Sequence, residues 1–231
     1  MKLAVPNIGD VSALWLRPAS TRCALVLAHG AGAGMGHPFL EKLAVELASV
    51  EVATFRYQFP YMEQRRRVPD APSVLTSAVR AAVHAASKTA PELPLLAGGK
   101  SMGGRMTSLA AAEHRSELAP ELEKVQGLVF FGFPLHPPGR PGTKRAAHLT
   151  QVRKPMLFLQ GTRDQFAELK LLRPICANLG TWATLREIET ADHSFHVLKS
   201  SGKTDAEVLR ELAQSVRDWA QTLSRSDSGK K

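Results

Sequence analysis

The chain of 231 residues, 44% of them hydrophobic, is long enough to bury the core of one domain. Its two cysteines exclude a disulfide framework and a zinc site. No stretch has the form of a signal peptide or a membrane span, so we expect a cytoplasmic protein that does not enter a membrane. The formal net charge of +9 permits anionic partners without requiring them, and the densest basic cluster, residues 65–67, lacks interleaved aromatic residues, so nucleic acid is not an expected partner.

Apolar runs of strand length alternate along the chain with longer segments of helical periodicity. The expected strands are residues 11–16, 24–29, 52–57, 93–98, 127–133, 156–160 and 184–188. The expected helices are residues 38–49, 73–89, 104–114, 166–179 and 205–223. This alternation predicts an α/β fold with a mostly parallel sheet covered by helices on both faces, and the residues before 17 can add an antiparallel edge.

Local signals set several of these boundaries. Pro38 stands near a helix start, Ser73 is placed as an N-cap, and Thr204 precedes two acids at the start of the last helix. Residues 134–154 are rich in proline and predict a loop with a short helix near 144–149, which leaves little room for a lid. We therefore expect a single domain over residues 1–223 with an open site, and a disordered tail over 224–231.

The pentapeptide Gly99-Lys100-Ser101-Met102-Gly103 lies between an expected strand and an expected helix, as a nucleophile elbow requires. A serine on such a sharp turn has a strained backbone, and side chains two residues away on either side would collide. The same letters resemble the end of a phosphate-binding loop, but the glycine that this loop needs five residues before Gly99 is replaced by Pro94. Ser101 is therefore the candidate nucleophile.

The glycine-rich segment 29–36 follows an early strand. A dinucleotide-binding turn would need its third glycine at residue 35 or 37, where Met35 and His37 stand. An oxyanion loop fits better, with backbone N–H donors from Ala31 and from Met102, the residue after the nucleophile. A flexible loop without chemistry remains the alternative, and His29, at the strand end, is expected to be structural.

A reactive serine needs a base and an acid that orients it, and in this type of sheet they follow in the order acid, then histidine. Asp164 comes directly after one expected strand, and His193 comes after the last one. Glu168 or Asp192 remain alternative acids, Asp164 could instead cap a helix, and His196 is the alternative base.

Residues near the elbow complete the expected site. Lys100 and Arg105 flank Ser101 and are expected to face solvent or to be structural, with contact to an anionic substrate as the alternative. The expected substrate pocket consists of Gly32, Tyr57, Phe133, Pro134 and Leu135.

Together the glycine-rich loop, the elbow, Asp164 and His193 resemble the α/β-hydrolase superfamily over nearly the whole chain. The segments 29–39, 98–105 and 133–138 look most like a small lidless group related to dienelactone hydrolases, which includes testis-expressed proteins and a domain of a chromatin-complex subunit. Dienelactone hydrolases proper use a cysteine nucleophile, whereas this chain has Ser101. The resemblance implies a sheet of seven or eight strands, no cofactor or metal, and hydrolysis of a small ester, thioester or amide through an acyl-enzyme.

The contrasting hypothesis is a non-catalytic interaction module on the same fold, with a basic surface that binds acidic partners. The sequence indicates no oligomeric state.

Overall fold

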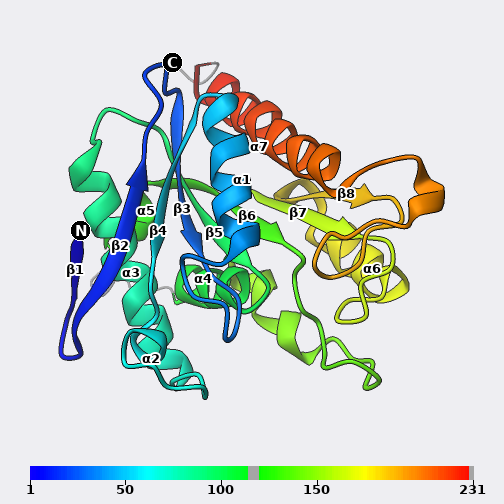
Figure 1. Ribbon diagram of the computed structural model, residues 1–231, viewed down its shortest axis with the longest axis horizontal. Helices are drawn as coiled ribbons and strands as arrows, with labels where there is room; N and C mark the ends of the chain where they lie inside the picture. Colours follow the sequence, from blue (N-terminus) through cyan, green and yellow to red (C-terminus); the bar gives the residue numbers. More distant parts are fainter. Residues whose placement is uncertain (114–119, 229–231) are drawn as a thin grey trace.

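The computed structural model describes residues 1–113 and 120–228, and within them eight strands form a mostly parallel sheet (Figure 1). The strands are β1 (Lys2–Val5), β2 (Gly9–Leu16), β3 (Cys23–Ala28), β4 (Val52–Tyr57), β5 (Leu95–Lys100), β6 (Val125–Phe131), β7 (Met156–Gly161) and β8 (Ala183–Ile188). Their order is β1-β2-β4-β3-β5-β6-β7-β8; β2 is antiparallel to both of its neighbours, and all the other pairs are parallel. The expected fold class and the antiparallel edge are confirmed.

Helices cover both faces of this sheet, as predicted. The helices are α1 (Pro38–Ser49), α2 (Pro60–Glu63), α3 (Pro72–Thr89), α4 (Met102–Ala112), α5 (Pro120–Glu123), α6 (Leu169–Leu179) and α7 (Asp205–Ser228), with 3-10 turns η1 (Lys144–Gln151), η2 (Gly180–Trp182) and η3 (Lys199–Ser201). Helices α1 and α7 pack on one face, and α3, α4 and α6 pack on the other.

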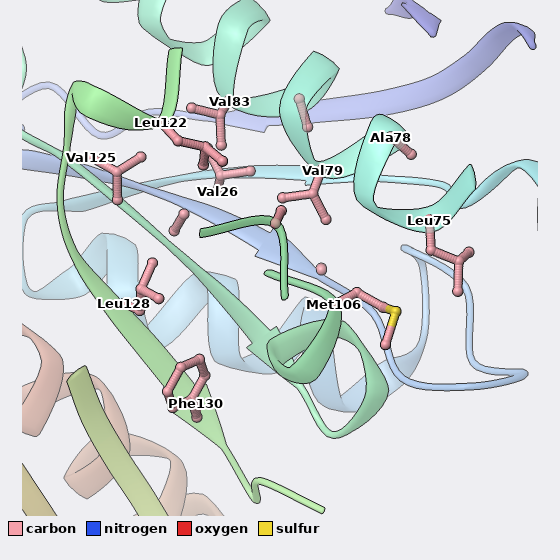
Figure 2. Packing of buried hydrophobic residues seen from close by; sticks show 14 of the residues in the cluster. Val26, Leu75, Ala78, Val79, Val83, Met106, Leu122, Val125, Leu128 and Phe130 are labelled. Atoms are coloured by element: carbon pink, nitrogen blue, oxygen red, sulfur yellow. The ribbon is translucent and has the colours of Figure 1, made fainter. Parts of the chain in front are cut away.

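Alternation along the buried strands explains why both faces need cover. In β3, Val26 belongs to the core beneath α3 and α4, whereas Leu25 and Leu27 belong to the core beneath α1 and α7. Figure 2 shows the first of these cores, where Val79 of α3 and Met106 of α4 lie over strand residues such as Val26. The two cysteines are free and buried, and burial raises the pKa of each to about 11.

The boundaries that differ from prediction lie mostly beside the site. Strand β5 continues to Lys100 and α4 begins at Met102, two residues before its predicted start; the predicted helix end at residue 114 lies outside the described residues. Strand β6 ends at Phe131, and α6 begins at Leu169 rather than at residue 166. The turn at the elbow is therefore tighter than predicted, whereas the segments that follow β6 and precede α6 are longer than predicted.

The predicted helix caps have mixed outcomes. Helix α3 has Ala71 at its N-cap and a proline at its first position, so the N-cap prediction for Ser73 is wrong. At α7 the prediction is confirmed: Thr204 Oγ1 accepts from the Glu207 backbone N–H at 3.2 Å, and the Glu207 carboxylate accepts from the Thr204 N–H at 2.7 Å. Helix α7 continues to Ser228, so only residues 229–231 of the expected disordered tail lie outside the described residues. None of the helices in the described ranges has the length and apolar character needed to cross a membrane.

Candidate active site

Ser101 stands alone between the end of β5 and the start of α4, with φ 50° and ψ −116°. Its N–H donates to Phe131 O at 3.1 Å, so the strained residue is fixed to the neighbouring strand. A Cβ at Gly99 would lie 2.5 Å from Ala28 O, and one at Gly103 would lie 2.6 Å from the same oxygen. The two glycines are therefore required because side chains would collide with the end of β3, which brings the elbow against the glycine-rich loop.

The structure brings Ser101, His193 and Asp164 together. His193 Nε2 lies 2.9 Å from Ser101 Oγ, and His193 Nδ1 lies 2.7 Å from Asp164 Oδ2. The Asp164 side chain is fully buried, whereas that of His193 is 19% exposed. Because the carboxylate accepts only, it selects the imidazole tautomer protonated at Nδ1, and Nε2 is left to accept the serine proton.

The alternative acids and base have other partners. Glu168 pairs with the lysine two residues after it at 2.6 Å. One carboxylate oxygen of Asp192 accepts from the backbone N–H groups of Ser194 and His196, at 2.8 and 3.0 Å. The His196 ring contacts Asp205 at the start of α7. Asp164 does not cap α6, whose N-cap is Glu168; its Oδ1 accepts from the Phe166 N–H at 2.7 Å in the loop before that helix, while Oδ2 faces His193.

Two residues that the sequence reasoning missed hold the acid and the base. Gln160, completely buried in β7, donates from Nε2 to Asp164 Oδ2 at 2.5 Å and accepts at Oε1 from the Phe133 N–H at 2.9 Å. The ring of Phe166 covers the His193 ring, with centroids 4.2 Å apart. A polar residue at the end of an otherwise apolar strand was the available signal for Gln160; Phe166 had none.

The loop before α1 lies against the elbow: a Cβ placed on Gly30 would be 3.8 Å from Ser101 Cβ. His29 is buried and its pKa falls to about 4 through burial, so it is neutral; its Nδ1–H donates to Gly30 O at 2.7 Å, and its Nε2 accepts from the Phe59 N–H at 3.0 Å. This confirms that His29 is structural. The Gly32 N–H donates to the Tyr61 hydroxyl at 2.9 Å.

The N–H groups of the two expected oxyanion donors, unlike that of Gly32, are not engaged in a hydrogen bond with a described residue. Within residues 1–113 and 120–228, no group accepts a hydrogen bond from the N–H of Ala31 or of Met102. Ala31 is exposed and Met102, the first residue of α4, is half-buried. Both amides are therefore free to bind a substrate oxygen.

The expected pocket is corrected for four of its five residues. Tyr57 and Phe133 have no exposed surface, Leu135 is 1% exposed and Pro134 is also buried, whereas Gly32 is exposed. Tyr57 packs against Phe59 in the core. Gly132, with φ 69°, turns the chain at the end of β6, and the Phe133 ring then packs against the rings of Phe130 and Phe158. These four side chains are therefore part of the core and do not line an open pocket.

Of the two expectations for Lys100, that it faces solvent or that it is structural, the first is wrong. Its Nζ is buried, because β5 extends two residues further than predicted and directs this side chain to the α1 and α7 face of the sheet. Arg105 is half-buried, and within the described parts of the chain its Nε has no hydrogen-bond partner.

Comparison with known proteins agrees with this architecture. The family model of the alpha/beta hydrolase domain matches residues 21–221, and the chain belongs to that family. Dienelactone hydrolase from Anabaena variabilis is 21% identical with a TM-score of 0.72, over 96% of this chain and 95% of that one.

Two further solved structures are similar at this level. XC6422 from Xanthomonas campestris, an α/β serine hydrolase without a lid, is 18% identical with a TM-score of 0.71, over 95% of this chain and 93% of that one. An alpha-beta serine hydrolase homologue from Coxiella burnetii is 17% identical with a TM-score of 0.74, over 93% and 95%. At these identities the likeness shows a shared fold.

Proposed function

We propose that this protein is a serine hydrolase that cleaves a small ester, as carboxylesterases do, or a thioester, through an acyl-enzyme on Ser101. The observation that carries the proposal is the continuous hydrogen-bonded chain from Ser101 Oγ through the His193 ring to Asp164. A structural serine has no need of a buried carboxylate aligned behind a partly exposed histidine. Membership of the alpha/beta hydrolase family supports the same assignment.

In the acylation step, Ser101 Oγ attacks the substrate carbonyl carbon while His193 Nε2 takes the hydroxyl proton. Asp164 stabilises the imidazolium that forms and keeps its ring in place. The carbonyl oxygen becomes an oxyanion, which the N–H groups of Ala31 and Met102 bind. His193 then gives the proton to the departing alcohol or thiol, and the acyl group remains on Ser101.

Deacylation uses the same groups in reverse. His193 removes a proton from a water molecule, which attacks the acyl carbon, and the same two N–H groups bind the second oxyanion. Collapse of this intermediate returns the proton to Ser101 Oγ and releases the acid. Each oxyanion donor contributes about 3 kcal/mol to lowering the barrier in enzymes of this type.

The first test is covalent labelling with a fluorophosphonate probe followed by peptide mapping. We expect the folded protein to be labelled on Ser101 and the Ser101→Ala variant to be unlabelled. Ser49→Ala, at an exposed hydroxyl at the end of α1, is the matched control and should be labelled like the wild type. Folded wild-type protein without label on Ser101 would reject the proposal.

Substrate class is tested by comparing matched acyl groups. Hydrolysis of p-nitrophenyl esters and of thioesters with the same short acyl chains gives kcat/KM for each leaving group. We expect measurable turnover of short esters, and Ser101→Ala should remove it together with the labelling.

The net charge of +9 favours one alternative, an interaction module that binds acidic partners. Salt-dependent binding to an acidic peptide, with no labelling of Ser101 and no ester turnover, would support this alternative and contradict the hydrolase proposal.

A further inference from the structure

A buried cation lies directly behind the candidate triad. Lys100 is the last residue of β5, and within the described residues its buried Nζ has no hydrogen-bond acceptor. Burial lowers the pKa of Lys100 to about 8, and the carboxylates of Asp164 and Asp192 act in the opposite direction. An ammonium group in such a place is costly, so a compensating role is expected.

Two stacked aromatic rings face the Lys100 ammonium. Its Nζ lies 5.9 Å from the centroid of the Phe39 ring and 5.6 Å from that of Phe195, and the two rings are stacked 5.7 Å apart. Phe39 lies at the start of α1, just after the glycine-rich loop, and Phe195 follows His193 by two residues. Lys100 therefore faces both the helix that follows the glycine-rich loop and the segment that carries His193.

The gap at Gly132 brings the ammonium close to the acid and the base. A Cβ placed on Gly132 would lie 3.2 Å from Lys100 Nζ and 3.4 Å from both Asp164 Oδ2 and His193 Nδ1. The ammonium and two atoms of the His193–Asp164 hydrogen bond thus lie around one point, which glycine leaves without a side chain. At such separations inside the protein, water screens the field of the ammonium only weakly.

We propose that Lys100 is a positioning residue for the reaction assigned above to Ser101. Its positive charge lies near the Asp164 carboxylate and the His193 ring, and its contacts with Phe39 and Phe195 connect the start of α1 to the segment that carries His193. The inference rests on the proposed hydrolase function.

Few groups determine the charge balance around Lys100. Among the described residues, the carboxylates that act on it are those of Asp164, after β7, and Asp192, after β8. The His193 ring faces it across Gly132, and α1 contributes the uncharged ring of Phe39. Removal of the ammonium therefore takes away a positive charge that faces the His193 ring, and an imidazole already protonated at both nitrogens cannot accept the Ser101 proton.

The test is the pH dependence of fluorophosphonate labelling in wild type and in Lys100→Met, whose side chain is similar in length but uncharged. Labelling needs a neutral His193, so the rate falls on the acidic side. In Lys100→Met we expect this fall to occur about one pH unit higher. The displacement should persist in about 0.5 M salt, because the interacting groups are buried.

Lys88→Met, which removes an exposed charge from α3, is the matched control and should leave the pH profile in place. A folded Lys100→Met with an unmoved acidic limb overturns the proposal, even if its maximal rate falls, because the lysine then contributes packing alone. Wild-type protein that is unlabelled at every pH rejects the hydrolase function instead.

A measurement that needs neither activity nor a Lys100 variant uses NMR of protein with 13C-labelled lysine. One Cε resonance of the wild type should titrate near pH 8. In Asp164→Asn its midpoint should fall further, because the carboxylate that stabilises the ammonium is gone. If every lysine titrates near its ordinary value of about 10.4, or if Asp164→Asn moves no resonance, the proposal is wrong.

Discussion

Replacement of Gln160 by methionine should weaken both the fold and the proposed catalysis. The Gln160 side chain is completely buried and bridges Asp164 Oδ2 and the Phe133 N–H. Methionine fills a similar volume but makes neither hydrogen bond. A hydrogen bond to a charged group is worth about 1.5–3 kcal/mol, and a buried N–H without a partner costs about 1–3 kcal/mol. The combined loss in the free energy of unfolding should be about 3 kcal/mol, since neighbouring effects are not additive.

Two assays separate the consequences of Gln160→Met. Urea unfolding followed by circular dichroism measures stability, and for a chain of this size the expected loss corresponds to a fall in Tm of about 6–12 °C. Release of p-nitrophenol measures kcat and KM. We expect kcat to fall about 10- to 100-fold with KM nearly unchanged, because Asp164 loses one of its fixed partners while the exposed surface is unaltered.

Gln214→Met is the matched control for this experiment. Gln214 is exposed on α7 and donates to Asp218 at 2.8 Å, one helical turn away. Its loss should change stability by less than about 0.5 kcal/mol and leave kcat unaffected. If Gln160→Met is no more destabilising than Gln214→Met, the bridging role is refuted. If stability falls while kcat does not, Gln160 supports the fold without positioning the acid.

Three further changes have expected outcomes. Gly103→Ala should lower Tm and abolish labelling, because its Cβ would lie 2.6 Å from Ala28 O. Hydrogen bonds from Thr204 hold the pKa of Glu207 below its ordinary value, so the stability that Glu207→Gln removes should be present at neutral pH and vanish as acid protonates Glu207. Burial lowers the pKa of His29 to about 4, so only the unfolded chain binds a proton there between about pH 6.5 and 4. Urea titrations should show that the free energy of unfolding decreases by about 3 kcal/mol as the pH is lowered from about 6.5 to 4. The decrease should be smaller in His29→Gln.

The arrangement of strands and the meeting of Ser101, Asp164 and His193 were predictable because both depend on patterns in the chain. Buried strands are apolar on both faces, and the loops that follow parallel strands gather at one edge of a sheet. Residues placed just after the ends of three strands therefore had to lie near one another. In the structure two hydrogen bonds join these three side chains.

The surroundings of the site were not predictable, because side-chain direction depends on single-residue register. The predicted end of β5 was two residues short, so Lys100 was assigned to a loop, whereas it continues the strand face that Leu96 presents to α1 and α7. The positive φ of Gly132 likewise returns Phe133 to the core instead of a pocket. Neither the register nor the turn has a signature in composition or periodicity.

The elbow connects these observations into one arrangement. A non-glycine residue with the backbone angles of Ser101 costs about 1–3 kcal/mol, and it persists because its N–H is bonded to Phe131 O and its carbonyl accepts from the Arg105 N–H at 3.1 Å. The same sharp turn directs two adjacent side chains to different places. The Ser101 hydroxyl contacts His193 at the edge of the sheet, whereas the Lys100 ammonium is buried on the face covered by α1 and α7. A strained turn that only exposed a nucleophile would not need a charged residue before it. The buried ammonium is therefore best understood together with the serine, as parts of one electrostatic arrangement around His193 and Asp164.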